Sequence, residues 1–178
     1  MKKLSLLLAV LFAGSINAQT KSFEPSSKAT FEVGNMIFNT VEGSISGARG
    51  TAEYDDGILV AIEGTLDANT IKSGNTTRDA HLKDKQEFFN TVETPNIDFT
   101  AREVVFVGKS SGVTTYKLNG SLTLRGVSND IEIEVKETSA NHLVSTFTVN
   151  RDLWGLGDGW SKIIIARDIE VRVDIYLE

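Results

Sequence analysis

Alternation of apolar and polar residues is the feature that most limits the folds open to this chain. Between residues 58 and 69, Ile58, Ile62 and Leu66 belong to a mainly apolar series, while Glu63 and Asp67 belong to a mainly polar one. The pattern recurs at 163–177, and similar shorter runs occupy 28–38, 41–54, 97–107, 113–124, 130–137 and 142–151. Successive side chains of a strand point to opposite faces, so the pattern predicts about eight half-buried β-strands.

Short turn sequences separate these runs, among them Asp55-Asp56-Gly57, Ser139-Ala140-Asn141 and Leu156-Gly157-Asp158-Gly159. Such short connections favour an antiparallel meander over βαβ units. A meander with one apolar face can form a sandwich or close into a barrel, and closure alone removes both edges. We therefore predict an all-β fold, an eight-stranded antiparallel barrel, whose interior either fills with side chains or holds one small ligand.

One helical segment interrupts the strand pattern at about residues 76–90. Thr76 and Asp79 stand three positions apart at its start, as in a capping box. We predict a short helix that covers one end of the barrel.

The N-terminus has the three parts of a secretory signal peptide. Lys2 and Lys3 precede the apolar stretch 4–13, and small residues end at Ala18. The competing interpretation is a membrane anchor, but the apolar stretch is shorter than the roughly 20 residues of a spanning helix. We predict a signal peptide over residues 1–18, cleavage near Ala18, a single domain over 19–178, and a periplasmic or secreted location without a stable membrane anchor.

The amino-acid composition of the chain limits the kinds of partner that it can bind. The predicted mature chain has 16 basic and 24 acidic residues and no basic block, which argues against nucleic acid and anionic membrane surfaces. The chain has no cysteine, which excludes disulfides, thiolate metal sites and a lipidated N-terminal cysteine. An exported domain of this kind must rely on its apolar core and its strand pairing.

Four segments resemble the YceI-like family of lipid- or polyisoprenoid-binding proteins. The most specific runs from Ser73 to Lys83 and continues through Phe88-Phe89-Asn90 to Pro95-Asn96-Ile97-Asp98-Phe99. The others are the glycine pattern of residues 43–57, the stretch Gly120 to Ser128, and Asn150-Arg151-Asp152-Leu153-Trp154-Gly155. The resemblance spans about residues 21–178, with Phe23 to Lys28 in place of the family's usual Asp-x-x-His-Ser. It implies a YceI-like lipid-binding domain, a lipocalin-like barrel whose elongated apolar cavity takes an isoprenoid or fatty chain.

An apolar lining suffices to bind such a chain, because each buried methylene contributes about 0.8 kcal/mol. For each candidate lining residue the alternative is ordinary core packing. The predicted lining residues are Phe31, Val33, Met36, Phe38, Ile62, Leu66, Phe99, Tyr116, Leu118, Leu122, Phe147, Val149, Trp154, Ile165 and Val171.

Arg78, Asp79 and His81 form the polar cluster that most suggests catalysis, because an imidazole beside a carboxylate could act as a general base. Helix capping and docking of the helix to the barrel rim are the favoured interpretation. His81 and His142 stand 61 positions apart without metal-ligand spacing, so we predict no metal site and no cofactor.

The resulting prediction is an exported binding protein, not an enzyme, that holds a polyisoprenoid, an isoprenoid quinone or a fatty-acyl lipid for transport, storage or sequestration. Two alternatives stay open: a stress-related structural protein with a filled barrel, and an enzyme acting on such a lipid through His81 and Asp79. The sequence also leaves a homodimer open.

Overall fold

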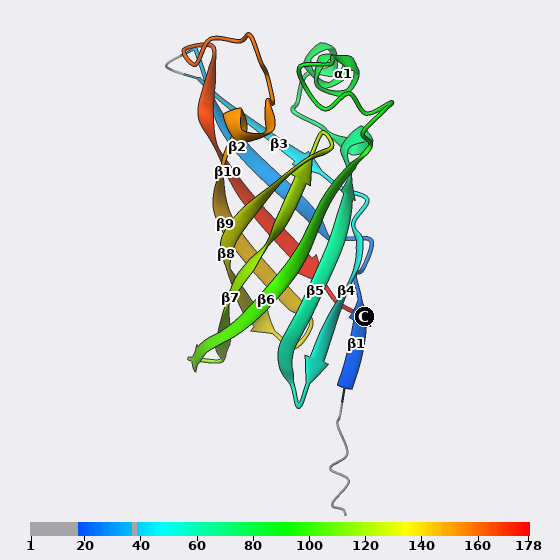
Figure 1. Ribbon diagram of the computed structural model, residues 1–178, viewed down its shortest axis with the longest axis vertical. Coiled ribbons are helices and arrows are strands. Elements are labelled where there is room, and N and C mark those ends of the chain that lie inside the picture. Colours follow the sequence, from blue (N-terminus) through cyan, green and yellow to red (C-terminus); the bar gives the residue numbers. More distant parts are fainter. Residues whose placement is uncertain (1–17, 37–38) are drawn as a thin grey trace, which may run out of the picture.

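A computed structural model describes residues 18–36 and 39–178, which form one strongly curled antiparallel sheet with the helical segments gathered at one end (Figure 1). The strands are β1 (Ala18–Ser22), β2 (Lys28–Asn35), β3 (Asn39–Ile45), β4 (Arg49–Asp55), β5 (Ile58–Asp67), β6 (Asn96–Ser110), β7 (Val113–Leu124), β8 (Val127–Ser139), β9 (His142–Asn150) and β10 (Ile165–Tyr176). The helical segments are η1 (Ala68–Thr70), α1 (Thr76–Asp84) and η2 (Arg151–Trp154).

The strand order is β1-β4-β5-β6-β7-β8-β9-β10-β2-β3, and every pair is antiparallel. Two isolated bridges join the outer strands of this sheet to segments outside the named strands. Phe23, just after β1, pairs with Leu177 beyond β10, and Ser44 of β3 pairs with Lys72 between η1 and α1. These bridges close the sheet into the predicted barrel.

The predicted count of eight strands was wrong, because the described residues form ten. The run 41–54 is two strands, β3 and β4, separated at Gly47, whose φ of 72° turns the chain through the left-handed region. The other additional strand, β1, carries no apolar face that alternation could reveal. The predicted signal peptide lies outside the described residues except for Ala18, and it stays a prediction.

At the start of β5, the apolar series that alternation predicts to face the barrel interior instead faces outward. Ile58 and Val60 point outward, 38% and 48% exposed, whereas Leu59 is buried. The pairing with β4 shifts here, with Glu53 opposite Ala61 and Tyr54 opposite Leu59, so Val60 is the extra residue of a β-bulge. Beyond the bulge, Ile62 returns to the barrel interior, as predicted.

The interior contains two apolar clusters. The cluster at the end away from α1 is built on Tyr54, Leu59, Tyr116, Leu118 and Leu143 and is densely buried. The second cluster lies toward α1 and the loop after η2, and it includes residues from both. The barrel is therefore packed shut at one end and roofed by α1 and the neighbouring loops at the other.

The predicted helix over 76–90 exists but ends at Asp84. Its N-cap is Asn75, whose side chain accepts a hydrogen bond from the Arg78 amide over 3.0 Å, so the predicted capping box of Thr76 and Asp79 is wrong. Within the ranges described, no helix has the length and apolar character needed to span a bilayer.

Candidate binding cavity

A cavity of about 560 Å³ occupies the barrel between the packed end and the α1 end. Its walls come from strands around the whole barrel, and its lining is almost entirely aliphatic and aromatic. Small-molecule sites commonly have volumes of roughly 300–1,000 Å³ and apolar linings. This cavity has the size and the character of such a site.

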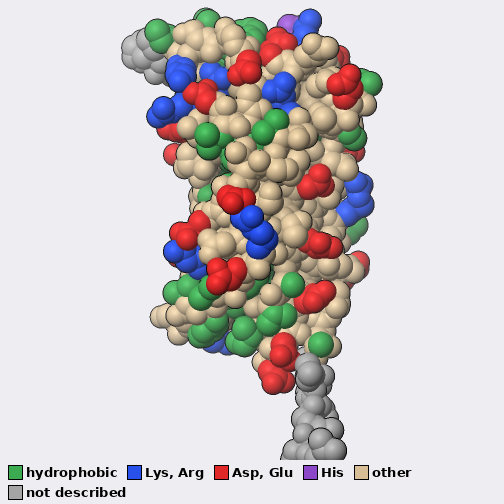
Figure 2. Space-filling model, viewed as in Figure 1, with side chains coloured by type: hydrophobic (Ala, Val, Ile, Leu, Met, Phe, Trp, Pro, Cys, Tyr) green, Lys and Arg blue, Asp and Glu red, His purple; other side chains and the backbone are tan. Residues whose placement is uncertain are grey.

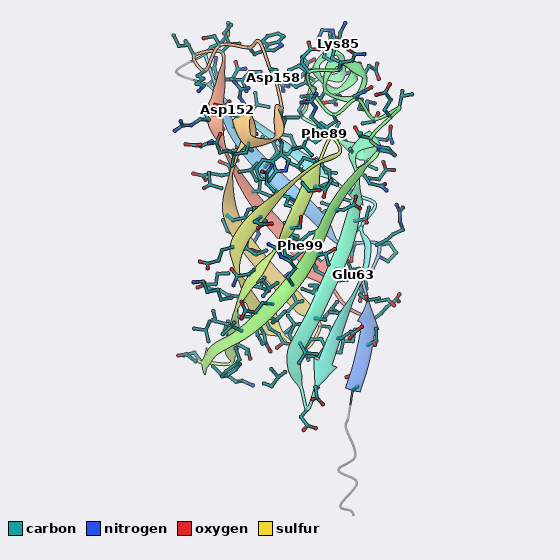
Figure 3. The ribbon with its side chains drawn as sticks, viewed as in Figure 1. Glu63, Lys85, Phe89, Phe99, Asp152 and Asp158 are labelled. Carbon is teal, nitrogen blue, oxygen red and sulfur yellow. The ribbon has the colours of Figure 1, made fainter. Side chains whose placement is uncertain are left out.

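The structure brings most of the predicted lining residues together around this cavity. In Figure 3, Phe99 lies at mid-barrel on β6, and Phe89 lies beneath α1. The predicted residues that line the cavity are Phe31, Val33, Ile62, Leu66, Phe99, Leu118, Leu122, Phe147, Val149, Ile165 and Val171. Their contact with a ligand stays a prediction.

Four predicted residues lie elsewhere. Met36 is 60% exposed at the end of β2, and Phe38 lies outside the described residues. Tyr116 is fully buried in the cluster at the packed end. Trp154 is also buried, and its Nε1 donates to the Leu122 carbonyl oxygen over 3.1 Å, so its indole fixes η2 to β7. Tyr116 and Trp154 thus belong to the packing around the cavity.

The predicted lining residues did not include those that roof the cavity. Leu82 on α1, Phe88 and Phe89 after it, and Leu156 and Trp160 in the loop after η2 all line it. These residues follow no strand alternation, and only their place in the fold brings them over the barrel.

At the packed end, Glu137 joins two buried tyrosines. Its carboxylate accepts hydrogen bonds from the hydroxyls of Tyr54 and Tyr116, both at 3.3 Å, and the Leu59 amide donates to the Tyr116 hydroxyl at the same distance. Burial, reinforced by the negative charge of Glu137, raises the pKa of both tyrosines above 10.0. This end is therefore closed by neutral, hydrogen-bonded phenols.

Arg151 organises the roof at the other end. It is 3% exposed, and its guanidinium donates to five main-chain carbonyl oxygens, those of Leu156, Gly157, Trp160, Ile165 and Ala166, over 2.8–3.3 Å. All of these carbonyls belong to the loop after η2 or the start of β10. A buried cation satisfied by carbonyl groups thus fixes the fold of this loop.

A second arginine ties this loop to the α1 side. Arg125, in the β7–β8 turn, donates to the carbonyl oxygens of Gln86, Trp154 and Gly155. Nearby, the Gly157 amide donates to the Glu87 carbonyl oxygen, and the rings of Phe88 and Trp160 lie 5.9 Å apart. The two halves of the roof are thereby joined above β7 and β8.

The polar side chains at α1 are arranged to hold the local fold together. Asp79 accepts hydrogen bonds from the amide and hydroxyl of Ser73, and Arg78 donates to the hydroxyl and carbonyl oxygens of the same serine. Asp79 and Arg78 thus fix the chain entering the helix, a structural role, although they act through Ser73 and Asn75 is the residue that caps the helix. His81 is exposed and lines the cavity, and no hydrogen bond joins it to Asp79 within the part of the chain that the structure describes.

His142 lies on the outside of the barrel near its packed end. Its Nε2 is 3.0 Å from Asp174, its Nδ1 is 3.0 Å from the Thr138 hydroxyl, and its ring stacks on Tyr176 at 4.4 Å. Across residues 18–36 and 39–178, no three His, Cys, Asp or Glu side chains are placed to hold a metal ion.

The fold and the cavity together define an antiparallel barrel built around one internal apolar site. A model of the YceI-like domain matches residues 22–177, so this chain belongs to the YceI-like family.

Curated relatives share moderate sequence identity with this chain. A UPF0312 protein of Yersinia pestis (strain Pestoides F) is 27% identical over 190 aligned positions, which cover 95% of this chain and 96% of the relative. A UPF0312 protein of Staphylococcus aureus (strain N315) is 27% identical over 142 residues, 73% of this chain and 77% of the relative.

Solved structures share the fold at lower identity. BcnA of Burkholderia cenocepacia superposes with a TM-score of 0.73 at 15% identity, over 84% of this chain and 94% of that one. A polyisoprenoid-binding domain from Saccharophagus degradans superposes with a TM-score of 0.67 at 14% identity, over 89% of this chain and 97% of that one.

Proposed function

We propose that this protein is an exported carrier that holds a polyisoprenoid, an isoprenoid quinone or a fatty-acyl lipid in the barrel cavity, and that it does no chemistry on the ligand. The observation that carries the proposal is the cavity of about 560 Å³ with its nearly unbroken apolar lining. An extended hydrocarbon chain gains about 0.8 kcal/mol for each methylene it buries there. Transport, storage or sequestration outside the cytoplasm would each use this property.

Family membership supports the same assignment, and one neighbour in fold is described as a polyisoprenoid-binding domain. The cavity argues against the alternative of a barrel filled by its own side chains. The geometry at α1 argues against the enzyme alternative, because Asp79 is engaged by Ser73.

The test is native mass spectrometry of protein purified from its own compartment without detergent, followed by organic extraction. A stoichiometric isoprenoid or acyl species is expected, and the measured protein mass also reports whether residues 1–18 have been removed. A ligand-free mass that stays unchanged with added quinone, prenol and fatty acid would contradict the carrier assignment. A His81→Ala variant should keep its ligand, whereas accumulation of a chemically altered lipid in wild type but not in this variant would favour the enzyme.

A further inference from the structure

The cavity reaches the surface at the roofed end of the barrel. Asn75, Thr77 and His81 of the α1 region line it and are exposed, and Trp160 lines it from the opposite loop with 42% of its surface exposed. The ties made by Arg125 lie above β7 and β8. A ligand would therefore enter between α1 and the loop after η2, on the side of β2 and β3.

Large apolar side chains lie beside this opening and are exposed to solvent. We call them the apolar rim: Met36 (60% exposed), Trp160 (42%) and Ile163 (65%). The Met36 amide donates to the Ile164 carbonyl oxygen over 3.3 Å, which places Met36 beside the loop that carries Trp160 and Ile163. Several exposed apolar residues around one opening mark an interaction surface more strongly than scattered ones do.

Charge is distributed unevenly between this end and the rest of the barrel. The segments 72–95 and 150–168, which form the roof, contain seven basic and seven acidic residues. The remaining positions of 19–178 contain nine basic and 17 acidic residues. On the face in Figure 2, several Lys and Arg side chains gather near the α1 end, whereas Asp and Glu are spread along the barrel body.

This distribution of charge affects which lipid surfaces the apolar rim can approach. The electrically balanced roof is neither attracted nor repelled strongly by a phospholipid surface, whereas the acidic body is repelled by a surface of net negative charge, so a zwitterionic surface is the one that the whole molecule can approach. Trp160 adds an indole at the rim, the side chain that prefers the boundary between headgroups and acyl chains. A lipid ligand that enters here from a bilayer also avoids exposing its chain to water.

From these observations we propose that the apolar rim docks the cavity mouth onto a zwitterionic phospholipid surface for ligand exchange. The inference rests on the proposed carrier function. The contact is transient, because three side chains bury far less apolar area than a membrane-spanning segment does. Docking orients the barrel with its acidic body away from the bilayer.

The test measures partitioning onto phosphatidylcholine vesicles by flotation, together with quenching of tryptophan fluorescence by brominated acyl chains. Trp160 is available to the quencher, while Trp154 is 2% exposed and serves as an internal shielded reference. The double variant Met36→Ser/Ile163→Ser should lower partitioning by about tenfold, since roughly 1.4 kcal/mol of apolar burial corresponds to a factor of ten. Vesicles rich in anionic lipid should bind the wild type less well at low salt.

The matched control is Val105→Ser/Val107→Ser. These valines are 41% and 60% exposed on β6, in its half toward the packed end. This variant should partition like wild type. Equal losses in both double variants, or no vesicle binding by the wild type, would overturn the proposal. Self-association that the rim variant abolishes, without vesicle binding, would assign the rim to a second copy and overturn it too.

The lipid content of each variant separates this inference from the carrier assignment. Rim variants that keep their ligand but lose vesicle binding support docking. Vesicle binding through the rim by a protein that never contains or takes up lipid would leave docking intact and contradict the carrier assignment.

Discussion

The ring of Phe99 on β6 packs against the bare α-carbon of Gly120 on β7. A β-carbon added at Gly120 would lie 2.8 Å from the Phe99 ring and 2.6 Å from the Thr100 carbonyl oxygen. Phe31 and its cross-strand partner Gly43 have the same relationship. The glycines thus make room for aromatic rings in the cavity wall.

We expect Gly120→Ala to displace Phe99 into the cavity and to lower the free energy of unfolding by about 1–3 kcal/mol through overpacking. Lipid content should fall as well. Urea unfolding and extraction of bound lipid measure the two effects. Gly108→Ala is the control, because its added β-carbon meets no atom within 4 Å and Gly108 has no positive φ. Similar losses in both variants would refute the packing argument.

Replacing Arg151 should loosen the roof of the cavity. Arg151→Met removes the donors of five carbonyl groups, and we expect a loss of about 3 kcal/mol of unfolding free energy, since buried groups are left unsatisfied. Arg151→Lys should recover little, because an ammonium has only three donors and lacks the planar fork. Hydrogen exchange should accelerate in residues 155–165.

Arg167→Ala is the matched control for Arg151. Its guanidinium is half exposed and pairs with Asp168 at 3.4 Å, so about 0–1 kcal/mol should be lost. An Arg151→Met protein as stable as this control would contradict the role assigned to the buried cation.

Alkaline pH should destabilise the packed end. The pKa of Tyr54 and Tyr116 is raised in the folded state by burial and by Glu137, so above about pH 10 the unfolded chain can ionise where the folded chain cannot. The stabilisation that the two protonated tyrosines provide is fully present below about pH 10. It is lost as pH rises toward the pKa that each tyrosine has in the folded state. The variant Tyr54→Phe/Tyr116→Phe should be less stable near pH 7 but lose stability less steeply above pH 10. An unchanged alkaline slope in urea unfolding would contradict this.

Acid should weaken the outer contact between β9 and β10. Burial opposes ionisation of Asp174, but hydrogen bonds from Arg172 and His142 outweigh it and hold the pKa of Asp174 below 3.8. Its stabilising effect is therefore present above the unfolded value of 3.8 and is lost as pH falls through the lower folded value. Asp174→Asn should cost about 1–2 kcal/mol at pH 7 and much less near pH 2.

Asp130→Asn is the matched control for Asp174. Asp130 pairs with Arg102 at 2.7 Å, but its side chain is 75% exposed, so its loss should be small at either pH. If the Asp174→Asn deficit were the same at pH 7 and pH 2, the charge of Asp174 would not be its source.

Alternation along the strands, with the short turns between them, predicted the all-β barrel and placed eleven of the fifteen candidate residues on the cavity wall, because inward-facing positions repeat every second residue. It failed at Val60, where a bulge reverses the two faces, and at Gly47, where a single left-handed residue divides one run into two strands. Tyr116 stands at an inward-facing position in the alternation of β7, as a lining residue would. Only the contacts of its hydroxyl with Leu59 and Glu137 reveal that it closes the barrel. The roof depends on hydrogen bonds from Arg125 and Arg151 to main-chain carbonyl oxygens, and the sequence segments that contain these arginines do not show which carbonyls they bind.

The most direct test of the central claim compares an inward with an outward substitution on the same strand. Val149 of β9 lines the cavity, and its neighbour Thr148 is exposed on the outer face. Native mass spectrometry would measure the stoichiometry of a series of prenols of increasing length bound to wild type, Val149→Phe and Thr148→Phe. A carrier with its ligand inside the barrel should lose the longest prenols only in Val149→Phe, whereas the same length limit in all three proteins would contradict binding in this cavity.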